Sequence, residues 1–355
     1  MDEVNRAIRV CHVGPDPAGL GGISAVISVL TRASLHHRSL VTWRRGSTVR
    51  SLWLAVVAAL RLAGSPHEEV VHGHVSEGGS WLREGGLVVW AHLLGHRTAL
   101  TLHGADFGEW VSSSARAKLV VMVLRSTDVI FVLHEGDQRL VRRLTHGRAH
   151  IRLVMNPVVP AGGARDAGFP EAGTLWPDAE RREKGIDKSV RIAFVGEMSR
   201  RKGLDVLLEA WLHVTDATLV IAGPSGDVTP PKLATINCIG PVAPHQVEDI
   251  LRACDVLVLP SRAEALPMIL LECLSLGKPF ISTTVAGIPR LLASGACVLV
   301  QPGDVGGLVA AMAALINQPS LRSDMATKGR SWYEQNATPW VVLQQLEAGY
   351  SSSVL

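Results

Sequence analysis

The chain has 355 residues, of which 47% are hydrophobic and 19% are charged, and its net charge is +3. This length suits two domains, and the low share of charged residues excludes disorder over most of the chain. The small positive charge is compatible with anionic small molecules or a lipid surface, and it is too weak to predict nucleic-acid binding.

No segment has the pattern of a membrane span or an export signal. The most apolar stretch, residues 52–62, is interrupted by Arg61 and is too short to cross a bilayer. Residues 1–9 carry charges where a signal peptide needs an apolar core. Five scattered cysteines without a CxxC pair argue for a reducing compartment and against zinc. We therefore expect a cytoplasmic protein.

Short apolar runs alternate with helical stretches in the N-terminal half. The pattern predicts strands at residues 8–13, 40–42, 70–72, 98–102 and 129–133, and helices at residues 23–35, 52–63, 86–94, 115–125 and 135–144. Such alternation indicates a parallel sheet with helices on both faces. A stretch rich in Gly, Ala, Pro and charge then breaks the rhythm, and we interpret residues 161–188 as a linker.

The alternation restarts after the linker. It predicts strands at residues 191–195, 218–222, 235–239, 256–259, 279–282 and 297–300, and helices at residues 204–211, 246–252, 268–276, 305–317 and 321–334. We therefore predict an α/β protein with two tandem Rossmann-like, doubly wound domains, at residues 1–160 and 189–330. Residues 331–355 form a predicted helical segment with a break at Pro339. Such sheets bind ligands beyond the carboxyl ends of their strands.

Two features follow strands of the N-terminal half. A glycine-rich loop that includes Gly21 and Gly22 comes after the first strand, where it is either a ligand-binding loop or an ordinary flexible turn. His72, His74 and His103 lie at strand ends, where a neutral imidazole can donate a hydrogen bond to a ligand. Core or surface packing is the alternative for these histidines. A metal site built from the three is disfavoured, because no carboxylate lies at ligand spacing.

Two further features follow strands of the C-terminal half. Arg200, Arg201 and Lys202 precede a predicted helix, where basic side chains can bind a diphosphate or simply form a solvated turn. Glu264 lies in a loop, and Glu272 lies inside an apolar helix that begins after Pro267. In that helix the backbone N–H groups of Met268 and Ile269 are predicted to be unpaired and available to an anion.

Taken together, these motifs resemble those of the group 1, or family 4, retaining glycosyltransferases of GT-B fold. The resemblance rests on SRAEALPMILLECLSLGKPFISTTVAGIP with its Glu264-x7-Glu272 spacing, on FVGEMSRRKGLDVLLEAW, and on VVHGHVSEGGSW and LLGHRTALTLHGADF. It covers nearly the whole chain apart from the linker. It implies that the N-terminal domain binds the acceptor, that the C-terminal domain binds a nucleotide-diphosphate sugar, and that the two face each other across a cleft.

The resemblance also implies roles for single residues. Glu272 matches the residue that binds the ribose hydroxyls, and Lys202 with Arg201 matches the residues that neutralise the diphosphate. His103 and Glu264 match catalytic positions beside the donor sugar. As donor-binding residues, Gly21 and Gly22 then line the phosphates or the reacting centre from the N-terminal domain. Pro241 and Val242 meet the base, and Met268 and Ile269 offer N–H groups to the phosphate. Neither a metal nor a cofactor is expected, and the last helix is expected to cross back to the N-terminal domain.

Two positions depart from the family pattern. Glu197 stands where the family usually has an arginine, so a carboxylate here faces the expected diphosphate. We hypothesise that Glu197 turns away and that Arg200 or Arg201 supplies the missing charge. Ala265 and Pro267 stand where glycines are common. Because proline has no N–H, phosphate donors are expected to begin at Met268.

The sequence leaves the acceptor open. We expect a glycan, lipid-linked or small-molecule acceptor in the synthesis of a cell-surface polysaccharide or glycoconjugate. The apolar helix near residues 52–62 and four tryptophans of the N-terminal half suggest peripheral contact with the inner membrane face, although core packing explains the tryptophans equally well: Trp53, Trp81, Trp90 and Trp110. The alternative functions are another GT-B enzyme, such as a nucleotide-sugar epimerase, and an inactive nucleotide-sugar-binding scaffold. A tandem Rossmann dehydrogenase is disfavoured because the first loop lacks GxGxxG spacing.

Overall fold

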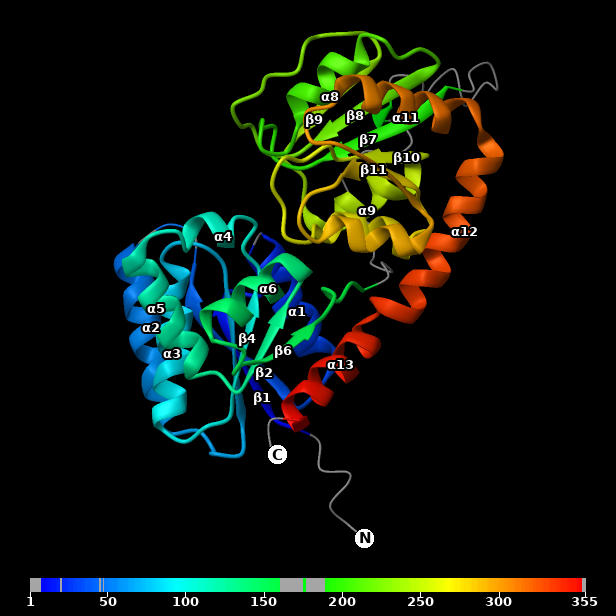
Figure 1. Ribbon diagram of the computed structural model, residues 1–355. Coiled ribbons are helices and arrows are strands. Elements are labelled where there is room, and N and C mark those ends of the chain that lie inside the picture. Colours follow the sequence, from blue (N-terminus) through cyan, green and yellow to red (C-terminus); the bar gives the residue numbers. More distant parts are fainter. Residues whose placement is uncertain are drawn as a thin grey trace. The chain divides into compact units, whose positions relative to one another are not determined.

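The computed structural model describes residues 8–19, 21–44, 46, 48–159, 175–176 and 189–352 (Figure 1). The chain divides into two compact units, which we call unit 1 (residues 1–158 and 337–355) and unit 2 (residues 159–336). None of the described helices is long and apolar enough to span a bilayer.

Unit 1 is built on a six-stranded, fully parallel sheet in the order β2-β1-β3-β4-β5-β6. Its strands are β1 (Val10–Pro15), β2 (His37–Trp43), β3 (Val70–Val75), β4 (Thr98–Leu102), β5 (Val129–Val132) and β6 (His150–Leu153). Its helices are α1 (Gly22–Ala33), α2 (Thr48–Ala63), α3 (Ser80–Leu93), α4 (Phe107–Trp110), α5 (Ser114–Arg125), α6 (Glu135–Leu144) and α13 (Pro339–Ser352). The strand order reverses between β1 and β3, and a ligand of such a sheet binds beyond the carboxyl ends of these two strands.

Unit 2 is built on a second six-stranded parallel sheet, in the order β12-β11-β10-β7-β8-β9. Its strands are β7 (Val190–Val195), β8 (Ala217–Ala222), β9 (Ile236–Gly240), β10 (Val256–Val258), β11 (Phe280–Thr283) and β12 (Cys297–Val300). Its helices are α8 (Leu204–Trp211), α9 (Pro244–Ala253), α10 (Met268–Ser275), η2 (Ile288–Ser294), α11 (Val305–Asn317) and α12 (Pro319–Asn336). The strand order reverses between β7 and β10. The predicted fold class is confirmed in both units.

The two faces of the unit 1 sheet differ in chemistry because side chains alternate along each strand. Cys11 and Val13 of β1 and Val71 of β3 join an apolar cluster with α2 and α3, which cover one face (Figure 1). His12 and His72 point to the other face, where α1 and α13 pack and also contact each other. The unit therefore has an apolar core on one side of the sheet and a row of buried histidines on the other.

The last helix belongs to unit 1. Helix α12 runs without a break to Asn336 within unit 2, and α13 begins at Pro339, which lacks the N–H needed to continue a helix. The side chain of Tyr350 in α13 is buried, hydrogen-bonds to His72 and packs edge-on against Phe131. The division between the units therefore falls at residue 336, six residues after the predicted domain end at residue 330.

Helix α3 begins at Ser80, and not at residue 86 as the sequence suggested. The two consecutive glycines at 85 and 86 weaken an isolated helix, which explains the late prediction. A Cβ on Gly85 would lie 3.0 Å from Val123 of α5, so the missing side chain allows α3 and α5 to pack closely. Tertiary packing therefore outweighs local helix propensity here. Strand β6 and helices α4 and η2 were not predicted.

The tryptophans of unit 1 divide into core and surface residues. Trp81 is buried and stacks on Phe107 and Trp110, so these two tryptophans serve core packing. Trp53 and Trp90 are exposed. The predicted linker lies outside the described residues apart from Leu175 and Trp176, which are both buried, and the guanidinium of Arg191 lies 5.4 Å from the ring centroid of Trp176.

Candidate active site

The loops after β7 and β10 meet at the switch point of the unit 2 sheet. Gly203, which ends the first loop and precedes α8, has φ +74, a conformation that favours glycine. A Cβ on Gly203 would overlap the carbonyl oxygen of Pro260 in the second loop. The N–H of Arg262 also donates to the carbonyl of Arg201 at 2.8 Å. These contacts hold the basic loop and the loop of Glu264 side by side.

Lys202 and Glu264 form an ion pair between these two loops. The Nζ of Lys202 donates to Oε1 of Glu264, and both side chains are largely buried. The hydroxyl of Ser261, itself fully buried, donates to the same carboxylate oxygen at 3.2 Å. The structure therefore brings together two predicted site residues that are 62 positions apart in the sequence.

The two arginines beside Lys202 have acidic partners of their own. Arg201 contacts Glu197, with 3.7 Å between Nη2 and Oε2, and both side chains are nearly half exposed. Arg200 contacts Asp205 at 3.5 Å, and its side chain is 71% exposed. Glu197 thus faces a neighbouring arginine, and compensation of its charge toward a diphosphate by Arg200 or Arg201 stays a prediction.

Arg262 is a further basic residue of this region that the sequence did not single out. Its two terminal nitrogens bind both carboxylate oxygens of Asp205, at 2.7 and 2.9 Å. Burial opposes ionisation of Asp205, yet the hydrogen bonds from Arg262 lower the pKa of this carboxyl below its ordinary value. Asp205 lies in the first turn of α8, where a negative charge is also favourable. This pair is better suited to fix the loop than to bind a ligand.

Helix α10 begins at Met268, as predicted from Pro267. Met268 and Ile269 are half-buried, and as first-turn residues they have no intrahelical acceptor for their N–H groups. Glu272 lies one turn further along the helix, and burial, with a smaller effect from Glu248, raises the pKa of its carboxyl to about 7. Among the described residues no hydrogen-bond donor contacts this carboxylate, so the hydroxyl groups of a ligand can donate hydrogen bonds to it.

Pro241 and Val242 follow β9 at the same edge of the unit 2 sheet. Pro241 is exposed and Val242 is half-buried. The strand end before them is held in place because Gly223, after β8, donates its N–H to the carbonyl of Gly240 at 2.8 Å. All predicted donor residues of unit 2 therefore lie in loops or a helix start that follow the carboxyl ends of β7, β9 and β10.

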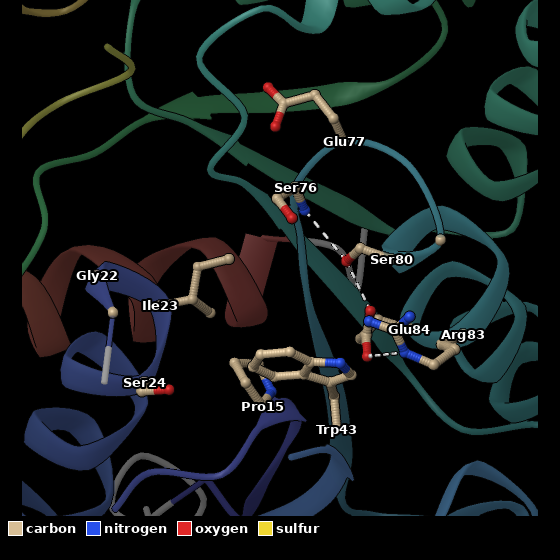
Figure 2. A pocket seen from close by; sticks show the side chains of 12 residues that line it. Pro15, Gly22, Ile23, Ser24, Trp43, Ser76, Glu77, Ser80, Arg83 and Glu84 are labelled. Carbon is tan, nitrogen blue, oxygen red and sulfur yellow. Dashed lines mark hydrogen bonds and ion pairs between the residues drawn. The ribbon is translucent and has the colours of Figure 1, made fainter. Parts of the chain in front are cut away.

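A cavity of about 360 Å³ lies at the switch point of the unit 1 sheet (Figure 2). Trp43 stands between the start of α1 on one side and Ser80, Arg83 and Glu84 of α3 on the other. The residues that line the cavity come from β1, α1, the end of β2, and the segment from the end of β3 into α3. They are Pro15, Gly21, Gly22, Ile23, Ser24, Trp43, Ser76, Glu77, Gly79, Ser80, Arg83 and Glu84.

Gly21 lies at the cavity edge with φ +129, a conformation that favours glycine, and a Cβ placed there would meet no atom within 4 Å. The space above the backbone is thus open to a ligand, as expected for a glycine-rich loop before a helix. Gly22, the first residue of α1, is exposed beside it. The structure therefore places both predicted glycines at the unit 1 cavity.

A buried carboxylate organises the other wall of this cavity. Glu84 is 1% exposed and accepts hydrogen bonds from Thr42 and, at 2.6 Å, from the hydroxyl of Ser80. The Nε of Arg83 lies 3.3 Å from the same carboxylate, as Figure 2 shows. Sequence reasoning missed Glu84 and Arg83, because Thr42, the partner of Glu84, lies 42 positions away in the sequence and no local pattern distinguishes the two residues from an ordinary surface of α3.

His103 follows β4 and is half-buried. Its Nε2 lies 3.0 Å from Nδ1 of His74, and burial lowers the pKa of His103 to about 3. The imidazole is therefore neutral at pH 7 and acts as a hydrogen-bonding group, not as a cation. Its loop adjoins the cavity, because the N–H of Asp106 donates to Oε1 of Glu77, a lining residue, at 2.8 Å.

The described residues contain one cluster with metal-ligand spacing, and its composition differs from the set that the sequence suggested. Ring nitrogens of His12, His72 and His74 lie within 4.8 Å of one another, whereas His103 is not part of the cluster. The nitrogens of His12 and His74 already hydrogen-bond to each other at 2.9 Å. Both nitrogens of His72 contact hydroxyls, those of Tyr350 and Thr101, at 2.7 Å. These contacts fit a hydrogen-bond network better than a metal site.

The sequence model of the family described as Glycosyl transferases group 1 matches residues 189–318. The chain therefore resembles the group 1 glycosyltransferases over residues 189–318. Among its relatives, TuaC of Bacillus subtilis strain 168, named for teichuronic acid biosynthesis, is 30% identical over 220 residues, which cover 60% of this chain and 53% of TuaC.

A second relative of the chain is the D-inositol 3-phosphate glycosyltransferase of Corynebacterium jeikeium. It is 26% identical over 295 residues, which cover 76% of this chain and 69% of the relative. The structure of HepE from Anabaena in complex with UDP has a TM-score of 0.71 at 14% identity, and the match covers 97% of this chain and all of HepE. This likeness confirms the GT-B fold. The chain spans about half the length of the first curated relatives it matches.

Proposed function

We propose that the protein transfers a sugar, with retention of anomeric configuration and without a metal, from a nucleotide-diphosphate sugar to a hydroxylated acceptor. The observation that carries this proposal is the buried ion pair of Lys202 and Glu264 at the switch point of unit 2, beside the start of α10. The group 1 family and the UDP-bound HepE structure support a nucleotide-sugar donor.

The side chains of unit 2 have the chemistry that such a donor requires. Lys202 and Arg201, with the N–H groups of Met268 and Ile269, supply positive charge and donors to a diphosphate. Glu272, with a pKa near 7 and no donor among the described residues, accepts hydrogen bonds from ribose hydroxyls. Pro241 and Val242 contact the base. Glu264, released from Lys202 by the diphosphate, binds hydroxyls of the sugar.

The unit 1 cavity is the proposed acceptor site. Its charged side chains are Glu77, which accepts the N–H of Asp106, and the ion pair of Arg83 and Glu84, and its other polar groups are uncharged. Trp43 offers an aromatic face to a sugar or cyclitol ring. Neutral His103 beside it donates a hydrogen bond to a reacting hydroxyl or to the developing charge of the leaving group. A glycan, a lipid-linked sugar or a small polyol all fit this chemistry, and the relatives named for teichuronic acid and inositol phosphate glycosylation support the same class.

The test is a transfer assay followed by proton NMR. UDP-, GDP-, ADP- and TDP-sugars are each incubated with the protein and a panel of polyol and sugar acceptors. We expect one nucleotide series to release nucleoside diphosphate and to give a product with the anomeric configuration of the donor. An inverted product would contradict retention. Donor isomerisation without acceptor would favour the epimerase alternative, and donor binding without turnover would favour the scaffold alternative.

We further propose that unit 1 contacts an anionic membrane surface from the cytoplasmic side through α2. One stripe of this helix exposes large apolar side chains at Val49, Leu52, Trp53, Val56 and Leu60. Exposed apolar residues at helical spacing beside arginines fit an interfacial helix that lies on a bilayer without crossing it. Flotation with vesicles that contain phosphatidylglycerol should recover the wild type, and the pair Trp53→Ser and Leu60→Ser should not float. Equal flotation of both proteins would contradict this contact.

A further inference from the structure

Four histidine rings form an unbroken chain of hydrogen bonds across the unit 1 sheet. Nδ1 of His37 lies 3.0 Å from Nε2 of His12, and Nδ1 of His12 lies 2.9 Å from Nε2 of His74. Nδ1 of His74 in turn lies 3.0 Å from Nε2 of His103. The rings come from β2, β1, β3 and the residue after β4, which are neighbours in the sheet. This histidine chain therefore ends at the residue proposed to act beside the acceptor.

All four rings are neutral at physiological pH. Burial lowers the pKa of His37 to about 4 and that of His103 to about 3, and it lowers the pKa of His12 and His74 well below the ordinary value. A neutral imidazole carries one N–H donor and one bare nitrogen acceptor. Each inner ring of the chain must therefore donate on one side and accept on the other.

This requirement leaves two arrangements of protons, and they differ at both ends of the chain. In the first, every Nδ1–H donates toward His103, which accepts at Nε2 and keeps its own proton on Nδ1. In the second, every Nε2–H donates toward His37, and His37 keeps its proton on Nε2. Since the three bonds share rings, reversal of one bond requires reversal of all three.

The surroundings of His37 distinguish the two arrangements. Nε2 of His37 is buried and has no hydrogen-bond partner among the described residues. The second arrangement places an N–H there without an acceptor, whereas the first leaves only a bare lone pair. A buried N–H without an acceptor is the rarer and more costly of the two. The first arrangement is therefore favoured.

We propose that the chain of His37, His12 and His74 holds His103 in the Nδ1–H tautomer, with Nε2 occupied by the N–H of His74. His12, His37 and His74 are then positioning residues, since they act on the reaction only through His103. Under the proposed function, on which this role rests, His103 is a fixed hydrogen-bond donor through Nδ1. Its Nε2 accepts the bond from His74 and is thus not free to act as a base.

His72 provides an internal control, because it lies in the same cluster but outside the chain. Its ring stacks on His74 with centroids 4.5 Å apart. Its two nitrogens contact the hydroxyls of Tyr350 and Thr101, both at 2.7 Å. Hydroxyls can donate or accept, so they satisfy either tautomer of His72. His72 therefore places no constraint on the direction of the chain.

The first experiment is tautomer assignment by long-range ¹H–¹⁵N NMR on the full chain labelled at histidine, without substrate. We expect the Nδ1–H pattern for His103, His74 and His12 between pH 6 and 8. An Nε2–H pattern at His103, or rapid exchange between the two patterns, would overturn the proposal. So would stoichiometric binding of added Zn²⁺ at His12 and His74, because a metal would replace the proton between them.

Three variants extend the test to the role of His103. His74→Leu removes the donor to Nε2, and His103 should then populate both tautomers, with a fall in kcat of about tenfold and an unchanged Kd for the nucleoside diphosphate. His74→Asn offers an amide N–H in place of Nδ1–H and should restore the tautomer and most of kcat. His72→Leu should leave the His103 tautomer unchanged. Circular dichroism melting verifies that each variant folds.

The two readouts separate the two claims. If His103 is fixed as Nδ1–H but no acceptor or donor is turned over, the proposed function fails while the histidine chain stands. If transfer is observed but the tautomer of His103 is unchanged in His74→Leu, the histidine chain fails while the function stands.

Discussion

The two switch points of the molecule differ in the charge state of the side chains that surround them. In unit 2, Lys202, Arg201 and Arg262 are paired with carboxylates at the loops after β7 and β10. In unit 1, the corresponding edge carries mainly neutral histidines, serines and an aromatic ring, and its charged side chains are Glu77 and the pair of Arg83 with the buried Glu84. Charged pairs suit a ligand that brings its own negative charge, whereas neutral donors and acceptors suit a polyol.

Under the proposed function, this difference explains how one fold supplies two kinds of site. Both sheets are parallel and both place loops at a topological switch point, so the backbone of each unit can form a ligand-binding site there. Only the residues in the loops decide whether a diphosphate or a hydroxylated ring is bound. Four substitutions test that comparison.

Gly203→Ala should disrupt the unit 2 site most strongly. The new Cβ would overlap the carbonyl of Pro260, and the residue would be held at a positive φ. We expect a loss of about 3 kcal/mol or more of unfolding free energy, measured by urea denaturation. Gly86→Ala, where a Cβ would meet no atom within 4 Å, is the matched control and should be neutral or slightly stabilising. Equal stability of the two variants would contradict the close contact between the two loops.

Lys202→Met should weaken donor binding while leaving acceptor binding unchanged. The loss of a charge-assisted contact to the diphosphate is expected to raise the donor Kd by about 100-fold, measured by calorimetry. Lys328→Met removes an exposed lysine of α12 that pairs with Asp324, and it should change the Kd by less than about twofold. A donor Kd that is the same in both variants would remove Lys202 from the site.

Glu272→Gln should separate donor affinity from stability. The raised pKa means that the folded protein retains a proton at pH 5–7 that the unfolded chain has lost, so the wild type becomes less stable as pH rises from about 4.5 to 7. The amide has no such penalty and should raise Tm by a few degrees at pH 8 and not at pH 4. Donor affinity should fall by about tenfold, because the ribose loses a charged acceptor.

The pH dependence of donor binding gives a check on the same residue. The ionised carboxylate is the better hydrogen-bond acceptor, so the wild type should bind the donor more tightly as pH increases from 6 to 8. In Glu272→Gln, the part of this rise in donor affinity that comes from ionisation of Glu272 should be absent. A Tm difference that is the same at pH 4 and pH 8 would show that Glu272 titrates as an ordinary exposed carboxyl.

Trp43→Ala should give the smallest effect and should be confined to unit 1. The ring is 36% exposed, so its removal mainly takes away a stacking surface for the acceptor. We expect the acceptor KM to rise by about five- to tenfold and the donor Kd to stay unchanged. Trp90→Ala, an exposed tryptophan outside the cavity, is the control. If Trp43→Ala changed the donor Kd and left the acceptor KM unchanged, the assignment of the acceptor to unit 1 and of the donor to unit 2 would be contradicted.

The parts of the molecule that the sequence predicted share a local signal. The alternation of strands and helices, the helix start after Pro267 and the basic loop at Lys202 are each encoded within about ten residues. The resemblance of the whole motif set then linked Glu264 with Lys202, which single patterns did not. Helix α3 started earlier than predicted, because contact with Val123 of α5 compensates for Gly85.

The parts that escaped prediction depend on contacts across the sheet. Strand β1 was recognised as an apolar run, and His12 at its centre was not considered as a functional residue. Its partners His37 and His74 lie 25 and 62 positions away and are joined to it only by the strand order. Glu84 likewise depends on Thr42, which lies at the end of a different strand. Such networks become visible only when the register of the parallel strands is known.

The most direct test of the central claim is the thermal shift of the full chain with a panel of nucleoside diphosphates and nucleotide sugars, with Glu272→Ala measured beside the wild type. A ligand that binds only the folded state raises Tm by mass action. We predict that one nucleotide series raises the Tm of the wild type and that Glu272→Ala loses most of this shift. An equal shift in both proteins, or no shift with any nucleotide, would contradict a donor site at α10 of unit 2.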